Sequence, residues 1–158
     1  MNPSLIAGVA ALALAGAAHA QAASPAQLEA NKRLVLEFYR NVFEPQRLEA
    51  MKDYYAPDIV EHNPNVASGI EGFASTMGRR WTAKPVQTQL QSPPVFVTAE
   101  GDLVTLVFKR PRPEPGDPSK SYDMYWFDMF RVRGGKIVEH WDAATKPVPA
   151  QASAPTRP

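Results

Sequence analysis

The sequence contains no cysteine, which excludes disulfide bonds, thiolate metal sites and a cysteine nucleophile. The fold must therefore be stabilised by packing, and any catalysis must use other side chains. A strong charge of either sign is lacking as well, because 17 Lys and Arg residues offset 16 Asp and Glu residues for a net charge of +1. With no basic stripe and no aromatic RNA-binding motif, nucleic acid is not an expected partner. We expect the partner to be a small molecule or a second copy of the chain.

The N-terminus has a long small and apolar run over residues 5–18, which ends in the sequence AHA at 18–20 and suits signal peptidase. The run is too short to span a bilayer comfortably, and residues 21–27 are polar and small. We expect residues 1–20 to be a signal peptide cut after Ala20, so the protein would be periplasmic or secreted, without a stable membrane anchor. The first four residues contain no lysine or arginine, which departs from the signal pattern. A retained N-terminal anchor is the alternative.

The rest of the chain has the size of one domain. We expect residues 21–146 to form that domain around a single core. Residues 147–158 are rich in proline and alanine and have no periodic apolar pattern, which predicts a disordered tail.

Helical periodicity predicts a first helix over residues 24–43. Ser24 suits the N-cap, and Gln27 can close a capping box on it. Two shorter helices are predicted over residues 47–54 and 70–81, the second with glycines near its start.

From residue 86 onward the apolar period alternates, which predicts strands. The predicted strands are residues 86–91, 95–99, 103–110, 122–133 and 136–142. Residues 100–102 are expected to form a tight hairpin turn, whereas residues 111–120, with four prolines, are expected to form a polar loop. Because helices come first and strands second, we expect an α+β domain with three helices on one face of a mostly antiparallel sheet.

The closing hairpin allows two registers around its Gly134-Gly135 turn. A two-residue loop places Trp141 opposite Asp128, whereas a three-residue loop places His140 opposite Asp128. We favour the three-residue loop because it gathers an apolar wall and three ionisable groups on one face. That face would carry Trp126, Asp128, Phe130, Val132, Val138, His140 and Asp142.

The other face of the hairpin is also rich in aromatic residues. It would carry Tyr125, Phe127, Met129, Arg131, Ile137, Glu139 and Trp141. A sheet that is apolar on both faces is covered on both, so we expect helices on one side and a homodimer partner on the other.

Three stretches resemble the SnoaL-like polyketide cyclase family within the nuclear transport factor 2-like superfamily. They are YAPDIVEHNP at 55–64, GIEGF at 69–73 and DMFRVRGGKIVEHWD at 128–142, in the family's order and across nearly the whole domain. The resemblance implies a cone of helices closed over a strongly curved sheet, an α+β barrel that encloses a pocket. The same scaffold carries cyclases, isomerases, dehydratases, epoxide hydrolases and non-catalytic binders, so it does not name a reaction.

In the cyclases, an aspartate at the end of the last strand is the general acid/base of an aldol closure, without metal or cofactor. The resemblance therefore implies this role for Asp142, with His140 two positions before it. In the ketosteroid isomerases of the same fold, the base is an aspartate near residues 61–64. Asn63 holds that place here and cannot take a proton, so the isomerase route is not expected.

The residues themselves support acid/base chemistry by Asp142, His140 and Asp128. An imidazole titrates near working pH, and an apolar pocket raises the pKa of a carboxyl group. The alternative is a structural pair between Asp128 and His140 that satisfies two half-buried polar groups. His62 and Asn63 would position a substrate carbonyl or a water, or else form an ordinary turn.

The remaining candidates are aromatic. Tyr39, Trp81, Trp126 and Phe130 would bind a hydrophobic substrate, with core packing as the alternative for each. No metal or other cofactor is expected, because the histidines lack the close spacing of a metal motif.

The leading hypothesis is an exported, cofactor-independent enzyme of lyase or isomerase type that moves a proton beside a carbonyl or hydroxyl of a small hydrophobic compound. Aldol-type cyclisation, dehydration and hydrolysis are the reactions considered. A binding protein without turnover and a dimerising module are the alternatives.

Overall fold

The computed structural model describes residues 23–147. The expected signal peptide, and the tail from residue 148 onward, lie outside the described residues. Among those described, no helix has the length and hydrophobicity needed to cross a bilayer.

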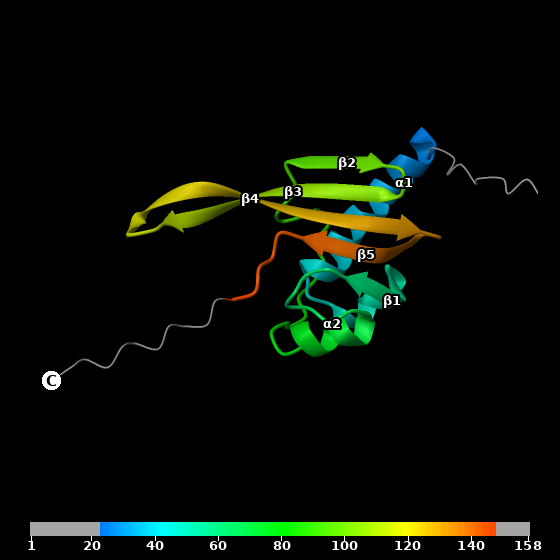
Figure 1. The fold of residues 1–158 in the computed structure, drawn as a ribbon, viewed down its shortest axis with the longest axis horizontal. Coiled ribbons are helices and arrows are strands. Elements are labelled where there is room, and N and C mark those ends of the chain that lie inside the picture. Colours follow the sequence, from blue (N-terminus) through cyan, green and yellow to red (C-terminus); the bar gives the residue numbers. More distant parts are fainter. Residues whose placement is uncertain (1–22, 148–158) are drawn as a thin grey trace, which may run out of the picture.

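The elements follow the predicted order of helices first and strands second, except that strand β1 precedes helix α2. They are α1 (Pro25–Phe38), η1 (Tyr39–Phe43), η2 (Leu48–Asp53), β1 (Tyr55–Glu61), α2 (Ile70–Met77), β2 (Phe96–Glu100), β3 (Leu103–Glu114), β4 (Asp117–Arg133) and β5 (Lys136–Asp142). One sheet has the order β1-β5-β4-β3-β2, in which only β1 and β5 pair in parallel. Helix α1 lies against one face of this sheet, and α2 lies beside β1 (Figure 1). The α+β cone is confirmed, although the sheet is not closed into a barrel.

Helix α1 begins as its cap residues predict. The Ser24 hydroxyl accepts a hydrogen bond of 3.2 Å from the Gln27 backbone N–H. The Gln27 side chain donates to Asn31 at 2.8 Å instead of returning to Ser24, so only half of the expected capping box forms. The helix then continues as one π-helical turn, η1, in which Tyr39 and Val42 are buried. Such wide turns are common at functional sites, and this one directs Tyr39 toward the sheet.

Two predicted elements are wrong. Residues 86–91 form no strand. Instead, the Glu44 carboxylate accepts the N–H groups of Gln91 and Ser92 at 2.9 and 2.8 Å, which satisfies backbone that a sheet edge would otherwise pair.

The second error is the polar loop expected over residues 111–120. This segment extends β3 and β4 into a two-stranded ribbon that projects from the body of the protein, with a turn between Glu114 and Asp117 (Figure 1). Pro111 and Pro113 fit because a ribbon without further neighbours leaves one side of each strand free of ladder hydrogen bonds.

The closing hairpin differs from both registers considered. Gly134 and Gly135 have φ of 56° and 72° and form a two-residue loop, so the predicted three-residue loop is wrong. The pairing then shifts at a β-bulge in β5, and Asp128 lies opposite Asp142 rather than His140. The extra residue restores the alternation of faces beyond the bulge. Asp128, His140 and Asp142 therefore share the predicted face, while Ile137 replaces Val138 in the core.

The core lies between α1 and the inner face of the sheet. Phe38 is its centre, with a 4.7 Å stack on Tyr55 and a 6.1 Å edge contact to Phe130. One ring from the helix thus packs against both the edge strand β1 and the central strand β4.

We expect Phe38→Ala to lower the free energy of unfolding by about 3–5 kcal/mol, because it removes a ring that is 1% exposed and leaves a cavity. Val86→Ala is the control, since Val86 is 41% exposed in the irregular segment after α2; its effect should stay within about 0.5 kcal/mol. Urea denaturation measures both. Similar losses in the two variants would contradict this description of the core.

Candidate functional site

A partly open cavity of about 120 Å³ lies between the helices and the inner face of the sheet. Its walls are mostly apolar, and its polar groups gather on one side. The residues that line it are Phe38, Tyr39, Phe43, Tyr55, Glu61, Asn63, Val66, Phe73, Met77, Arg110, Trp126, Asp128, Phe130, His140 and Asp142.

Asp128, on the inner face of β4, is 4% exposed. The Tyr39 hydroxyl donates a hydrogen bond to its Oδ2 atom, and Trp126 Nε1 donates to its Oδ1 atom at 2.7 Å. The π turn brings the Tyr39 hydroxyl to Asp128. Trp126 lies two residues before Asp128 on the same strand, so both side chains are on one face of the sheet. The carboxyl group is held rigidly as a result.

His140 lies between two carboxyl groups. Its Nδ1 atom is 2.9 Å from both carboxyl oxygens of Glu61, and its Nε2 atom is 3.5 Å from Asp128 Oδ1. Its ring stacks on Phe130 with centroids 4.6 Å apart. Burial by itself lowers the pKa of His140, but the hydrogen bonds and charges of Asp128 and Glu61 outweigh it and raise the pKa from 6.5 to about 9. His140 is therefore an imidazolium at neutral pH.

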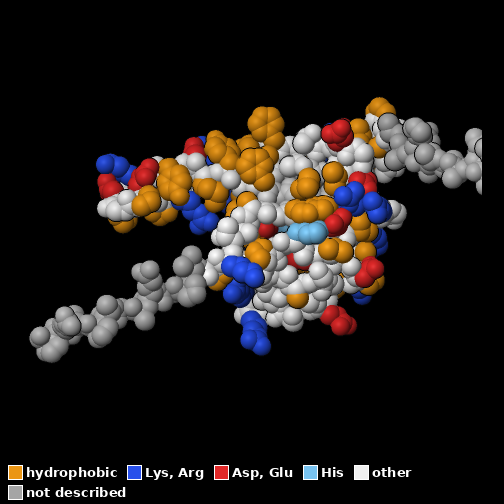
Figure 2. Space-filling view, viewed as in Figure 1, with side chains coloured by type: hydrophobic (Ala, Val, Ile, Leu, Met, Phe, Trp, Pro, Cys, Tyr) orange, Lys and Arg blue, Asp and Glu red, His pale blue; other side chains and the backbone are white. Residues whose placement is uncertain are grey.

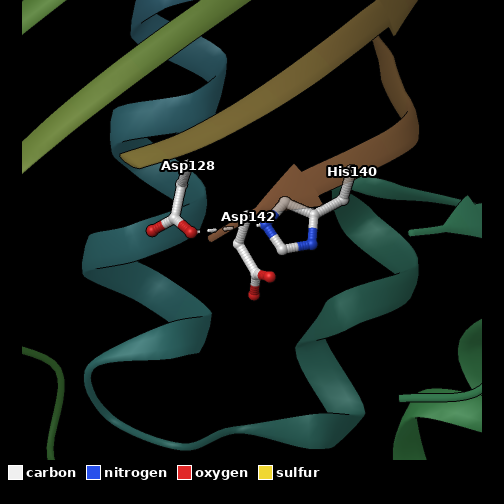
Figure 3. Close-up of side chains that lie close together, drawn as sticks. All are labelled: Asp128, His140 and Asp142. Atoms are coloured by element: carbon white, nitrogen blue, oxygen red, sulfur yellow. Dashed lines mark ion pairs between the residues drawn. The ribbon is translucent and has the colours of Figure 1, made fainter. Parts of the chain in front are cut away.

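Asp142 completes the cluster at the end of β5. Asn63 Nδ2 donates to its Oδ2 atom at 2.6 Å, and the Ala144 backbone N–H donates to Oδ1 at 2.9 Å. One ligand atom from each of Asp128, His140 and Asp142 lies within 4.8 Å of the other two (Figure 3). A carboxylate and an imidazolium thus face the same small cavity.

Two tyrosines border these acids and act as hydrogen-bond donors or neutral walls. Burial raises the pKa of Tyr39 well above its usual value, and the charge and hydrogen bond of Asp128 raise it further. Burial, followed by the charges of Glu61 and Asp128, likewise raises the pKa of Tyr55. Neither phenol ionises in the normal pH range.

The structure brings most of the predicted site residues together, but not His62 or Trp81. Because side chains alternate along a strand, His62 points away from the cavity that Asn63 faces. It stacks on Trp141 at 4.8 Å and pairs with Glu139 at 2.8 Å on the outer face of the sheet. Trp81 packs edge-on against Phe43 and Phe73, behind the cavity wall. The predicted contact of either residue with a ligand in this cavity is wrong.

Two charged cavity residues were not among the predicted candidates. Glu61 faces inward with Asn63, two positions later, and its side chain is 3% exposed. Arg110 continues the inward alternation of Phe108 on β3. The period of two was the signal that could have identified both.

Asp128, His140 and Asp142 are also the groups best placed to ligate a cation. A metal ion needs a neutral imidazole with a free lone pair. Both ring nitrogens of His140 face carboxyl oxygens, and its pKa is about 9. A metal would have to displace this proton, so the donor set fits an internal ion pair better than a metal site.

The family model described as the SnoaL-like domain matches residues 35–140. The match includes β4, β5 as far as His140 and the cavity residues from Phe38 to His140, whereas Asp142 lies two residues beyond it. The chain belongs to the SnoaL-like family. No curated protein matches this sequence.

Solved structures share the fold of this SnoaL-like chain. A protein from Jannaschia sp. CCS1 described as a SnoaL-like polyketide cyclase is 20% identical, with a TM-score of 0.53 over 77% of this chain and 90% of that one. One from Acidithiobacillus ferrooxidans described as a polyketide cyclase is 22% identical, with a TM-score of 0.51 over 72% and 86%. An M. tuberculosis LEH-like epoxide hydrolase is 16% identical, with a TM-score of 0.50 over 73% and 82%. These identities support a common fold, and the chemistry must be argued from the site.

The raised pKa of His140 predicts how stability depends on pH. The folded state holds this proton more tightly than the unfolded state, whose histidine titrates near 6.5. The difference from about 9 corresponds to roughly 3 kcal/mol, present in full below pH 6.5 and lost as the pH rises toward 9. Chemical denaturation from pH 6 to 10 should show this decline in wild type and not in His140→Gln. Parallel curves for the two proteins would contradict the buried imidazolium.

Proposed function

We propose that this SnoaL-like protein is a cofactor-independent enzyme that moves a proton beside a carbonyl or hydroxyl group of a small hydrophobic compound. The observation that carries the proposal is that Asp142 and the imidazolium of His140 face one partly open, largely apolar cavity. A base and a positive charge in such a place suit a reaction whose transition state develops negative charge on oxygen.

Asp142 is the proposed general acid/base. Each of its oxygens accepts one hydrogen bond, from Asn63 or Ala144, and each retains a further lone pair. The two donors fix the direction of the carboxylate, which prepares it to take a proton from a carbon next to a carbonyl or from a water molecule. Asn63 thus acts by orienting Asp142.

His140 is the proposed electrostatic partner. Its charge would stabilise an enolate or alkoxide formed within the cavity, where low polarity strengthens the interaction. Asp128 and Glu61 occupy both of its N–H groups and keep it protonated. We therefore assign Asp128, together with Tyr39 and Trp126, to holding His140 in place.

Aldol-type cyclisation, dehydration and hydrolysis can all begin with proton removal by such a carboxylate. The cavity of about 120 Å³ encloses only the reacting end of a substrate, because typical ligand pockets are about 300–1,000 Å³. A binding protein without turnover remains the second candidate, since the same cavity could hold a ligand.

Export and dimerisation are further parts of the proposal. Export rests on the apolar run at residues 5–18 and the AHA sequence that follows it. Homodimerisation is supported by exposed aromatic side chains on the outer face of the sheet, where Phe96, Tyr125 and Phe127 are 72%, 50% and 52% exposed. Hydrophobic side chains gather over the strands and the ribbon on this face (Figure 2).

Asp142→Asn should lower turnover by about 10²–10⁴-fold while the protein stays folded, because the amide keeps the shape but cannot take a proton. The melting temperature should fall modestly, since the amide can accept only one of the two hydrogen bonds that Asn63 and Ala144 donate. Turnover of small β-diketones, β-hydroxy ketones and epoxides would be followed by mass spectrometry. Asp58→Asn, on the exposed side of β1, is the matched control and should retain full activity. If no compound is converted yet one raises the melting temperature, the protein is a binder.

The rate should also fall as the pH rises through about 9, because His140 then loses the charge that the reaction uses. In Asp128→Asn this upper limb should move to lower pH, since the neutral amide removes one of the charges that raise the pKa of His140. A pH–rate profile of both proteins measures the shift. If the rate falls at the same high pH in both proteins, the charge of His140 does not contribute to the reaction.

A further inference from the structure

Arg110 is a half-buried cation beside the site for which the structure shows no ion-pair partner among residues 23–147. Its guanidinium lies over the rings of Trp126 and Phe108, at 5.0 and 5.7 Å from their centroids. Arg131, also half-buried, instead pairs with two carboxylates at 2.8 Å. Buried cations are normally paired, so the position of Arg110 suggests a partner from outside the chain.

Arg110 also stands where two spaces meet. It lines the inner cavity, and with Tyr39 and Phe43 it lines an outer cleft of about 680 Å³. Of the other charged residues of this cleft, Lys109 pairs with Asp123 at 2.7 Å and Glu44 accepts backbone N–H groups, whereas Arg112 is exposed. Arg110 is the cation that lines both spaces, so it is the one placed to meet a molecule that enters the inner cavity from the cleft.

The charges of the inner cavity fix which end of a molecule could meet Arg110. Glu61, Asp128 and Asp142 contribute three carboxyl groups against the single imidazolium of His140. A permanently anionic group would be repelled from this cluster and attracted to the guanidinium at its border, whereas an enolate forms in the cavity only as Asp142 takes up a proton and loses its own charge. A neutral end fits the inner cavity, and an anionic end fits the cleft.

We propose that Arg110 binds a carboxylate of the substrate, so that the substrate is a small organic acid whose uncharged, reacting end enters the cavity toward Asp142. That the bound acid is a substrate rests on the proposed function, whereas the binding of a carboxylate by Arg110 does not. A guanidinium meets a carboxylate in a planar, two-bonded geometry, and the aromatic walls of Trp126 and Phe108 strengthen this contact by excluding water. Trp126 links the two parts, since its face lies under Arg110 and its Nε1 atom bonds Asp128.

The test compares phenylacetate with phenylacetamide, which has nearly the same shape and no charge. Isothermal titration calorimetry should show that wild type binds phenylacetate at least about tenfold more tightly, as expected for a charge-assisted hydrogen-bonded pair. Arg110→Gln should abolish this preference and leave the affinity for phenylacetamide unchanged. Arg110→Lys should keep part of the preference for phenylacetate, because the positive charge remains while the planar pair of guanidinium N–H donors is lost.

Arg79→Gln is the control for general charge, since Arg79 is exposed and lines neither the inner cavity nor the cleft. It should keep the preference for the acid. Equal affinities in wild type, a preference that survives Arg110→Gln, an equal loss in Arg79→Gln, or no binding of either probe at millimolar concentration would each overturn the assignment. Binding is measured without turnover, so an acid preference in a protein with no catalytic activity would refute the enzyme proposal and retain this one.

Discussion

The imidazole of His140 lies between carboxyl groups from two other strands, and the arrangement of the sheet around the cavity depends on this contact. Glu61 ends β1, Asp128 lies on β4, and His140 belongs to β5 between them. A buried charge is costly unless it is paired, and removing one partner leaves another uncompensated. The parallel pairing of β1 with β5 and the polar cluster therefore stabilise each other. Tyr39 ties the first helix to it through Asp128.

The alternation of residues predicted much of this structure. It placed Asp128, His140 and Asp142 on one face, and the helix-to-strand order gave the α+β class. The same alternation, applied to residues 61–63, would have added Glu61 and turned His62 outward. The resemblance drew attention to the whole segment, whereas the choice of face required the strand period.

The missed features depend on contacts that are distant in sequence. Residues 86–91 alternate like a strand, but the Glu44 carboxylate satisfies their neighbouring backbone and no strand pairs with them. The prolines of residues 111–120 suggest a loop, yet a free two-stranded ribbon tolerates them. A bulge cannot be read from a single strand because it is a property of the pair. Local pattern thus predicted the face of most hairpin residues but not their partners, and it failed at the bulge, where Ile137 rather than Val138 is buried.

The bulge in β5 has a consequence for how this family can vary. The turn at Gly134 and Gly135 and the acid at Asp142 lie at opposite ends of the strand, and the unpaired residue between them acts as a frame correction. A turn that gains or loses one residue would otherwise invert every side chain beyond it. Because gain or loss of the bulge can compensate a change of one residue in the turn, the turn can change while Asp142 still faces the cavity. A designer could therefore rebuild the turn of this hairpin without redesigning the cavity.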